Sequence, residues 1–300
     1  MGISISEIKR VAKGIRRRVL EHTIRNNGGY LSQACSSAEI LSALYLRIMN
    51  LGPVESPIVP LPFSGVPGPD NPDYSTGAMF NGPQAPHLDR FFLSPSQYSL
   101  VLYATLIETG RMHPDGLEQF NRDGSTVEMI GGEHSPGMEV MSGSLGQGLS
   151  QAAGIAMARR LKGETGRVWV FMSDGEFQIG QTWEAIQTIS FYKLDNIGIY
   201  VDVNGYQCDG EVSKVMNIEP IKERLESFGA GVFRVDGHNI DELIAPAKLQ
   251  LDGKPIVVLC YTIPYQGIGI LKEMSPKFHY IRFKDDKEKR RYKEFLRVLR

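Results

Sequence analysis

The feature that most constrains the fold is an alternation of apolar and helix-like segments between residues 167 and 262. Four apolar runs occur at 168–172, 197–201, 232–235 and 256–260, the third with Arg234 inside it. Segments with helical spacing separate them, at 182–192, 219–227 and 239–249. Strands that are apolar throughout are typical of parallel sheets, whose two faces are both covered. The pattern therefore predicts an α/β fold, a parallel sheet with helices on both faces.

The regions before this alternation are predicted to hold helices and one long loop. Helical spacing predicts two helices within residues 4–50, and Ser36 with Glu39 resembles a capping box that opens the second. Residues 52–86 contain nine of the 17 prolines and no periodicity. They predict a Pro/Gly-rich loop, which is either part of a substrate wall or an ordered surface decoration. Residues 91–162 read as helical.

The C-terminal residues 282–300 form a segment of different character, with nine basic and four acidic residues. Apolar residues recur at helical spacing, which predicts a basic helical tail. The residues of this stripe are Tyr292, Phe295, Leu296 and Leu299. The tail is either a docking helix for a partner or a mostly solvated terminal helix.

Composition excludes several kinds of partner. The 33 Lys and Arg against 34 Asp and Glu give a formal net charge of −1, which offers no support for nucleic-acid binding. No apolar run approaches the ~20 residues that cross a membrane, and the N-terminus reads as mature sequence without a signal peptide. Cys35, Cys208 and Cys260 lack CxxC spacing and are most simply small buried apolar residues. We expect a protein of the reducing cytoplasm that acts on small molecules.

Polar residues follow two consecutive predicted strands where the strands end. Asp174 comes directly after the run 168–172, and Asn204 lies 30 residues later, after the next strand. Because ligands bind at the carboxyl ends of parallel strands, these two side chains should meet there. A carboxylate, an amide oxygen and the backbone carbonyl of Tyr206 are hard ligands that suit Mg²⁺. Taken alone, an Asp at a strand end is also typical of a helix cap, so both readings stay open.

The motif around Asp174 extends into a wider resemblance. Asp174-Gly175, Asn204 and the Gly-rich turn 143–148 resemble the thiamine diphosphate signature of the transketolase family. Other segments that look like this family's are 89–94, 137–150, 183–185, 193–196 and 235–239. The resemblance runs from about residue 8 to about residue 265. It implies the thiamine-diphosphate-binding fold, with residues 1–300 as a single diphosphate-binding domain and with thiamine diphosphate and Mg²⁺ as cofactors.

The resemblance also implies roles for individual residues. Gly175 would donate its backbone N–H to the diphosphate, and Gly143 and Leu145 would line the aminopyrimidine. The implied cofactor-binding residues are Gly143, Leu145, Asp174, Gly175 and Asn204. The implied metal ligands are Asp174, Asn204 and the main-chain oxygen of Tyr206. His279 falls where the family often has a histidine near the diphosphate and substrate, although a surface histidine is an equal alternative.

Several positions depart from the family pattern. Tyr30 and Gln97 stand where the family has histidines that contact substrate, and His134 is out of register with a third. Unlike histidine, Gln97 cannot carry charge, and Tyr30 titrates only near pH 10. We therefore expect non-standard substrates. Ile179 replaces a glutamate that joins the sites of two subunits, whereas Glu184 matches the family and is either part of that contact or ordinary helix surface.

Gln97, Glu184 and His279 are therefore the candidate catalytic residues. In transketolases a pyrimidine-binding domain follows the diphosphate-binding domain and supplies a glutamate that activates the cofactor. We expect a separate C-terminal transketolase-like subunit to supply it here, in an α2β2 assembly that transfers a two-carbon ketol or acyl unit. A decarboxylating carboligase acting on a 2-oxo acid, and a cofactor-binding subunit without its own catalysis, are the alternatives.

Overall fold

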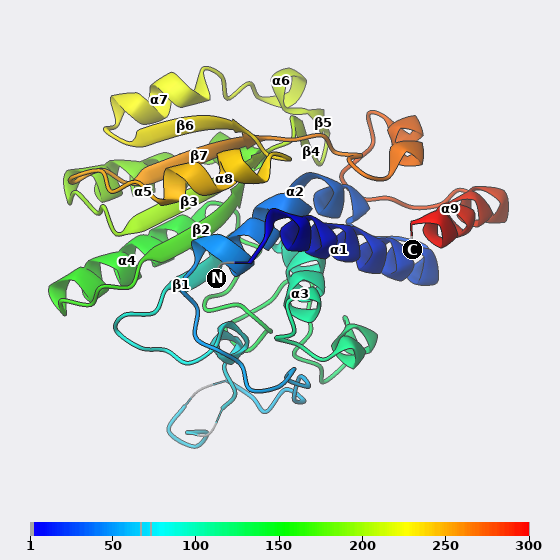
Figure 1. Cartoon of the computed structure of the whole chain (residues 1–300), viewed down its shortest axis with the longest axis horizontal. Coiled ribbons are helices and arrows are strands. Elements are labelled where there is room, and N and C mark those ends of the chain that lie inside the picture. Colours follow the sequence, from blue (N-terminus) through cyan, green and yellow to red (C-terminus); the bar gives the residue numbers. More distant parts are fainter. Residues whose placement is uncertain (1–2, 67, 73, 300) are drawn as a thin grey trace.

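A five-stranded parallel sheet lies at the centre of the structure, a computed structural model that describes residues 3–66, 68–72 and 74–299 (Figure 1). Its strand order is β1-β2-β3-β7-β6. The strands are β1 (Arg90–Leu93), β2 (Val168–Ser173), β3 (Ile197–Val203), β6 (Gly231–Asp236) and β7 (Ile256–Tyr261). The four predicted strands are confirmed as β2, β3, β6 and β7, and all the strand pairs in this sheet are parallel.

Strand β1 contradicts the prediction that residues 91–162 are helical. It pairs with β2 in register, Phe91 opposite Trp169 and Leu93 opposite Phe171. Only four residues long, β1 is too short for apolar periodicity to distinguish a strand from a helix start. Its place at the sheet edge is decided by the neighbouring strand rather than by its own sequence.

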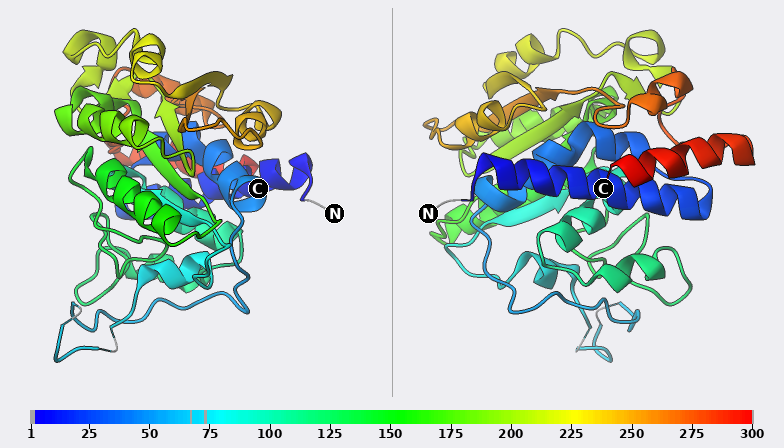
Figure 2. Two further views of the ribbon diagram at one scale, coloured as in Figure 1. Left: turned by 90° about the vertical axis from the view of Figure 1, so that its left-hand side faces the viewer. Right: turned by 45° about the vertical axis from the view of Figure 1, so that its right-hand side comes forward.

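Helices cover both faces of the sheet, as predicted (Figures 1 and 2). Successive residues of β2 belong to different hydrophobic clusters: Trp169 and Phe171 face α1, α2, α3 and α8, whereas Val170 and Met172 face α4, α5 and α7. The α-helices are α1 (Ile5–Asn26), α2 (Leu31–Ala43), α3 (Ser99–Glu108), α4 (Gln147–Leu161), α5 (Gly180–Phe191), α6 (Val212–Val215), α7 (Ile221–Ser227), α8 (Ile240–Ala247) and α9 (Asp286–Val298).

Shorter elements connect these helices and strands. The 3₁₀ helices are η2 (Gly77–Asn81), η3 (Ser96–Tyr98), η4 (Pro114–Gln119), η5 (Asp174–Gln178) and η6 (Gly269–Met274), and η1 (Leu44–Ile48) is a π-helical turn. Strands β4 (Tyr206–Gln207) and β5 (Gly210–Glu211) form a small antiparallel hairpin after β3. Helix α9 lies within the predicted basic tail, where Tyr292 is buried, and it contacts α1. Within the described residues, no helix is both long and apolar enough to cross a membrane.

Helix α2 begins earlier than its predicted capping box. Asn27, in the left-handed conformation, ends α1, and α2 starts at Leu31, so Ser36 and Glu39 lie inside the helix and are buried. The capping-box prediction is wrong, because residues inside a helix have their N–H groups bonded to the preceding turn. Ser36 instead donates to Asp202, and Glu39 pairs with a buried side chain of α1.

The Pro/Gly-rich loop 52–86 is anchored to residues 111–137 at several points. Ile58 forms a β-bridge with Met112, and Pro62 forms one with Ser125. The Asn81 side chain donates to the carbonyl of Gly137 at 3.1 Å. These contacts attach the loop to the lower part of the molecule in Figure 1, where it forms an extension of the fold.

Candidate active site

A cavity of about 350 Å³ opens at the carboxyl ends of β2 and β3. Seven of the nine predicted site residues line it, and they are Gln97, Leu145, Asp174, Gly175, Asn204, Tyr206 and His279. The other lining residues are Tyr30, Gln33, Tyr98, Ser173, Gln178, Gln207 and Cys208. None of the described residues of the loop, 52–66, 68–72 and 74–86, is among them, so these residues form no part of this wall.

A larger depression of about 750 Å³ lies between the C-terminal ends of α5 and α7 and the residues before β7. Gln187, Lys193 and Gly253 line it, and it contains none of the predicted site residues. Because it lies at the amino ends of the strands, away from the polar residues of the signature, the smaller cavity is the better candidate site.

Asp174 begins η5 directly after β2, and its carboxyl group is almost completely buried. Its Oδ2 atom accepts a hydrogen bond from the Gly205 N–H at 2.8 Å. Burial raises the pKa of Asp174 to about 8, and the nearby charge of Asp202 adds to that shift. A divalent cation would offset both effects, so this carboxyl group suits a metal ligand.

Asn204 lies on the same turn as Gly205, whose N–H contacts Asp174. Its Oδ1 atom accepts from the Tyr206 N–H at 2.9 Å, next to the Gly205 N–H that contacts Asp174. The turn thus brings together the two side chains that the sequence predicted would meet. Within the described residues no group of three or more His, Cys, Asp or Glu is arranged for a metal. The set proposed here has one carboxylate and neutral oxygens, which fits Mg²⁺ completed by phosphate and water.

The glycines and the leucine of the signature occupy different positions. Gly175 lines the cavity, and a β-carbon there would approach only Gln207, at 3.6 Å, so the protein itself leaves its cavity side open. Gly143 has a φ of +103° and lies outside the cavity lining. Leu145, two residues later, lines it. The positive φ explains the glycine at 143, because the turn requires a conformation that other residues rarely adopt.

His279 lies in the cavity wall with the two residues that replace family histidines, Tyr30 and Gln97. The rings of Tyr30 and His279 meet edge to face, with centroids 5.6 Å apart. Burial lowers the pKa of His279. The buried Gln33 side chain donates to the His279 carbonyl at 3.0 Å, while its Oε1 has no hydrogen-bond partner within the described residues. Sequence reasoning missed Gln33, which carries no motif signal.

Glu184 and Cys208 are both exposed. Glu184 lies on the exposed face of α5, outside the cavity lining, and its role stays a prediction. Cys208 is exposed in the β4–β5 hairpin at the cavity, so the expectation that it is buried is wrong, whereas Cys35 and Cys260 are buried. The hairpin extends beyond the sheet edge, which keeps Cys208 out of the core.

Two buried acidic residues complete the site, and both were missed. Glu176 accepts hydrogen bonds from the backbone N–H groups of Ser173 at 2.9 Å and Gly146 at 3.0 Å, and from Ser94 Oγ. It therefore ties together three segments around the cavity. Asp202 lies in β3, fully buried. A single charged residue inside an otherwise apolar strand was the signal that could have identified it.

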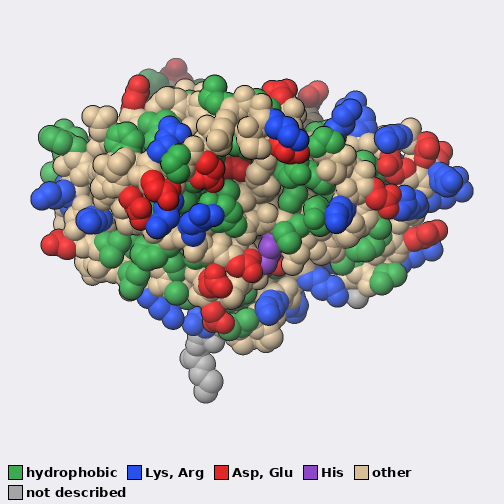
Figure 3. All heavy atoms as spheres, turned by 90° about the horizontal axis from the view of Figure 1, so that it is seen from above, with side chains coloured by type: hydrophobic (Ala, Val, Ile, Leu, Met, Phe, Trp, Pro, Cys, Tyr) green, Lys and Arg blue, Asp and Glu red, His purple; other side chains and the backbone are tan. Residues whose placement is uncertain are grey.

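Charged side chains of both signs lie on one face of the molecule. On the face seen in Figure 3, acidic and basic side chains are interspersed among apolar ones.

Comparisons with known proteins point to one family. A family model described as transketolase, thiamine diphosphate binding domain, matches residues 77–294. The transketolase family protein y4mO of Sinorhizobium fredii is 33% identical over 292 residues, covering 96% of this chain and 93% of that protein. An apulose-4-phosphate transketolase subunit of Actinobacillus succinogenes is 29% identical over 281 residues, covering 93% of this chain and 92% of that protein.

The solved transketolase of Campylobacter jejuni has the same fold, with a TM-score of 0.76 at 22% identity. The match covers 99% of this chain but 47% of the solved chain, so this chain spans about half the length of that transketolase. It spans nearly the whole of the two relatives above. The chain belongs to the transketolase family, and residues 77–294 match its thiamine diphosphate binding domain.

Proposed function

We propose that this chain is the diphosphate-binding subunit of a two-subunit transketolase-like transferase that moves a two-carbon ketol or acyl unit. The observation that carries the proposal is the single cavity shared by Asp174, Gly175, Asn204 and His279. It combines hard oxygen donors with an approachable backbone N–H, which a metal-bound diphosphate requires.

Different residues would hold different parts of the cofactor. Asp174, Asn204 and the Tyr206 carbonyl would bind Mg²⁺, and the Gly175 N–H would bind the diphosphate. The turn with Gly143 and Leu145 would line the aminopyrimidine and exclude water from it. When bound, thiamine diphosphate supplies the carbanion that carbon–carbon cleavage needs.

The residues of the cavity wall support the proposal that the substrate differs from that of standard transketolases. Near pH 7 Tyr30 and Gln97 carry no charge, and the lowered pKa of His279 leaves its imidazole neutral. These side chains can donate and accept hydrogen bonds but offer no positive charge to an oxyanion. We propose that they position a non-standard donor or acceptor, with His279 and Gln97 nearest the reaction.

A partner chain completes the proposed enzyme. One relative is named as one subunit of its transketolase, and this chain spans about half of a solved transketolase. We propose a C-terminal transketolase-like partner that carries the pyrimidine-binding domain and the catalytic glutamate, in a cytoplasmic α2β2 assembly. The exposed Glu184 would contact it. Residues 1–300 would act as a single diphosphate-binding domain, which two hydrophobic clusters on one shared sheet support.

Calorimetry with thiamine diphosphate and Mg²⁺ tests the cofactor site, first on the chain alone and then with a co-purified partner. Asp174→Ala should weaken binding at least tenfold, because the metal loses its carboxylate. Asp209→Ala is the matched control, since it removes an exposed carboxylate from the neighbouring hairpin. Equal binding by wild type and Asp174→Ala would overturn the site.

Turnover tests the division into two subunits. Ketol transfer should require both chains, and transfer by this chain alone would contradict the need for a partner. Release of CO₂ from a 2-oxo acid donor would identify a decarboxylating carboligase instead. Cofactor binding by the two-chain complex without turnover of any ketose or 2-oxo acid would leave a binding subunit without catalysis.

A further inference from the structure

Asp202 is a buried carboxyl group that accepts hydrogen bonds from four side chains, three of them on segments distant in the sequence and one, Asn204, two residues away. Its Oδ2 atom accepts from Ser36 Oγ at 2.5 Å and Tyr98 Oη at 2.7 Å. The same oxygen accepts from Asn204 Nδ2 at 3.1 Å. Its Oδ1 atom accepts from Thr262 Oγ1 at 2.5 Å. Helix α2, η3 and the residue after β7 thus converge on one carboxyl group beside a proposed metal ligand.

This arrangement determines which way the Asn204 amide faces. Its Nδ2 atom donates to both Asp202 Oδ2 and Tyr98 Oη, each at 3.1 Å. Because the Tyr98 hydroxyl proton is already donated to Asp202, the tyrosine oxygen is left as an acceptor. A flipped amide would point its carbonyl oxygen at two acceptors and lose both bonds. The Oδ1 atom must therefore face the turn at Tyr206, which also binds Asp174 through Gly205.

We propose that Tyr98 and Asp202 are positioning residues that hold the Asn204 amide with its oxygen toward the metal. This inference rests on the proposed function, since it concerns the same metal site. Neither residue touches the metal in this role; both act through Asn204. Hydrogen bonds of this kind to a ligand's other atoms commonly change metal affinity by about 10–100-fold when removed.

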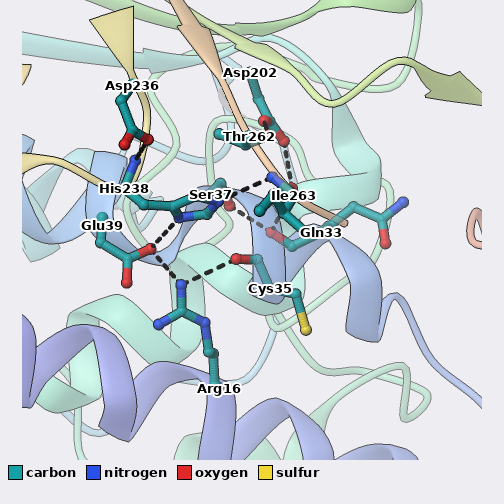
Figure 4. A network of polar contacts seen from close by, with 11 residues as sticks. Arg16, Gln33, Cys35, Ser37, Glu39, Asp202, Asp236, His238, Thr262 and Ile263 are labelled. Carbon is teal, nitrogen blue, oxygen red and sulfur yellow. Dashed lines mark hydrogen bonds and ion pairs between the residues drawn. The ribbon is translucent and has the colours of Figure 1, made fainter. Parts of the chain in front are cut away.

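Further hydrogen bonds connect the surroundings of Asp202 to neighbouring segments. Figure 4 shows the polar network that surrounds it, with Thr262 on Asp202 and the neighbouring Ile263 near His238. The Ile263 N–H donates to His238 Nε2 at 2.9 Å, and His238 Nδ1 contacts Glu39 at 3.0 Å. The segment after β7 is thereby fastened to α2, the helix that carries the Ser36 donor.

Tyr98→Phe is the direct test, because it removes one hydroxyl and keeps the ring. Tyr103→Phe is the matched control: Tyr103 is also buried, lies on the following helix, and donates to the Glu128 carbonyl away from the metal ligands. We expect Tyr98→Phe to raise the Mg²⁺ dissociation constant, titrated at fixed thiamine diphosphate, about 10–100-fold. The control should bind within twofold of wild type, while the two variants lose similar thermal stability without ligands.

Asp202→Asn is the second variant, with nearly the same shape, and it serves if Tyr98→Phe does not fold. It should weaken Mg²⁺ binding at least tenfold, because only one of the two terminal atoms of an asparagine side chain can accept hydrogen bonds. If the wild type binds Mg²⁺ and a folded variant has the same Mg²⁺ dissociation constant, the positioning role is overturned. The proposed function then still stands. No binding by the wild type, alone or with its partner, would overturn both.

Discussion

The buried pair between Arg16 and Glu39 offers the sharpest test of the packing between α1 and α2. The two side chains are 7% and 9% exposed, and Arg16 also donates to the Cys35 carbonyl at 3.0 Å. Glu39 accepts from His238 as well (Figure 4). Burial alone would raise the pKa of Glu39, but the His238 hydrogen bond and the Arg16 charge together hold it below its ordinary value.

Arg16→Met keeps an apolar stem but leaves the Glu39 carboxylate buried with a single donor. Removing one partner of a buried pair costs about 3–5 kcal/mol. We expect a loss near 3 kcal/mol in the free energy of unfolding, about the lower limit of that range, because His238 still donates. Arg10→Met is the matched control on the same helix, since its pair with Glu7 is 60% and 44% exposed. It should cost less than about 1 kcal/mol.

Glu39→Gln added to Arg16→Met should recover part of the loss. The glutamine can still accept from His238, and no stranded charge remains. Urea unfolding of the four proteins in the cycle gives the coupling between positions 16 and 39, which we expect at about 1–3 kcal/mol. If the two effects are additive, the double variant will be less stable than Arg16→Met by the full cost of Glu39→Gln in the wild type. That result would refute this account of the pair.

Two further predictions concern pH and the loop 52–86. Burial against Phe120 lowers the pKa of His22 from 6.5 to about 4. Between these two pH values the unfolded chain binds a proton that the folded chain does not. The free energy of unfolding therefore falls as the pH decreases from 6.5 to 4, by at most about 3 kcal/mol. His22→Gln should flatten that part of the pH profile of urea unfolding; an unchanged slope would contradict it. A β-carbon at Gly77 would overlap the Ser135 carbonyl, so Gly77→Ala should destabilise by about 1–3 kcal/mol. Gly154→Ala, in open space on α4, should be neutral or stabilising, and equal melting temperatures for the two variants would show that the loop is not anchored there.

Local sequence determined most of the fold and the place of the site. Each of β2, β3, β6 and β7 is a predominantly apolar run, with Asp202 in β3 and Arg234 and Asp236 in β6 as the charged exceptions. Such runs between helical segments leave a covered parallel sheet as the consistent arrangement. Asp174 and Asn204 follow two of these strands, so their meeting at one sheet edge followed from the connectivity. The residues that allowed these predictions lie within a few positions of each strand and of each proposed ligand.

Tertiary structure alone decided which polar residues support that site. Ser36 looked like part of a capping box and no sequence motif included Tyr98, yet both donate to Asp202, from 166 and 104 residues away in the chain. Strand β1 likewise exists because β2 offers it a partner. A buried polar group must find its hydrogen bonds wherever the fold supplies donors. Periodicity reports only a residue's own neighbours along the chain. The sequence therefore located the proposed metal ligands, and the three-dimensional packing determined which residues orient them.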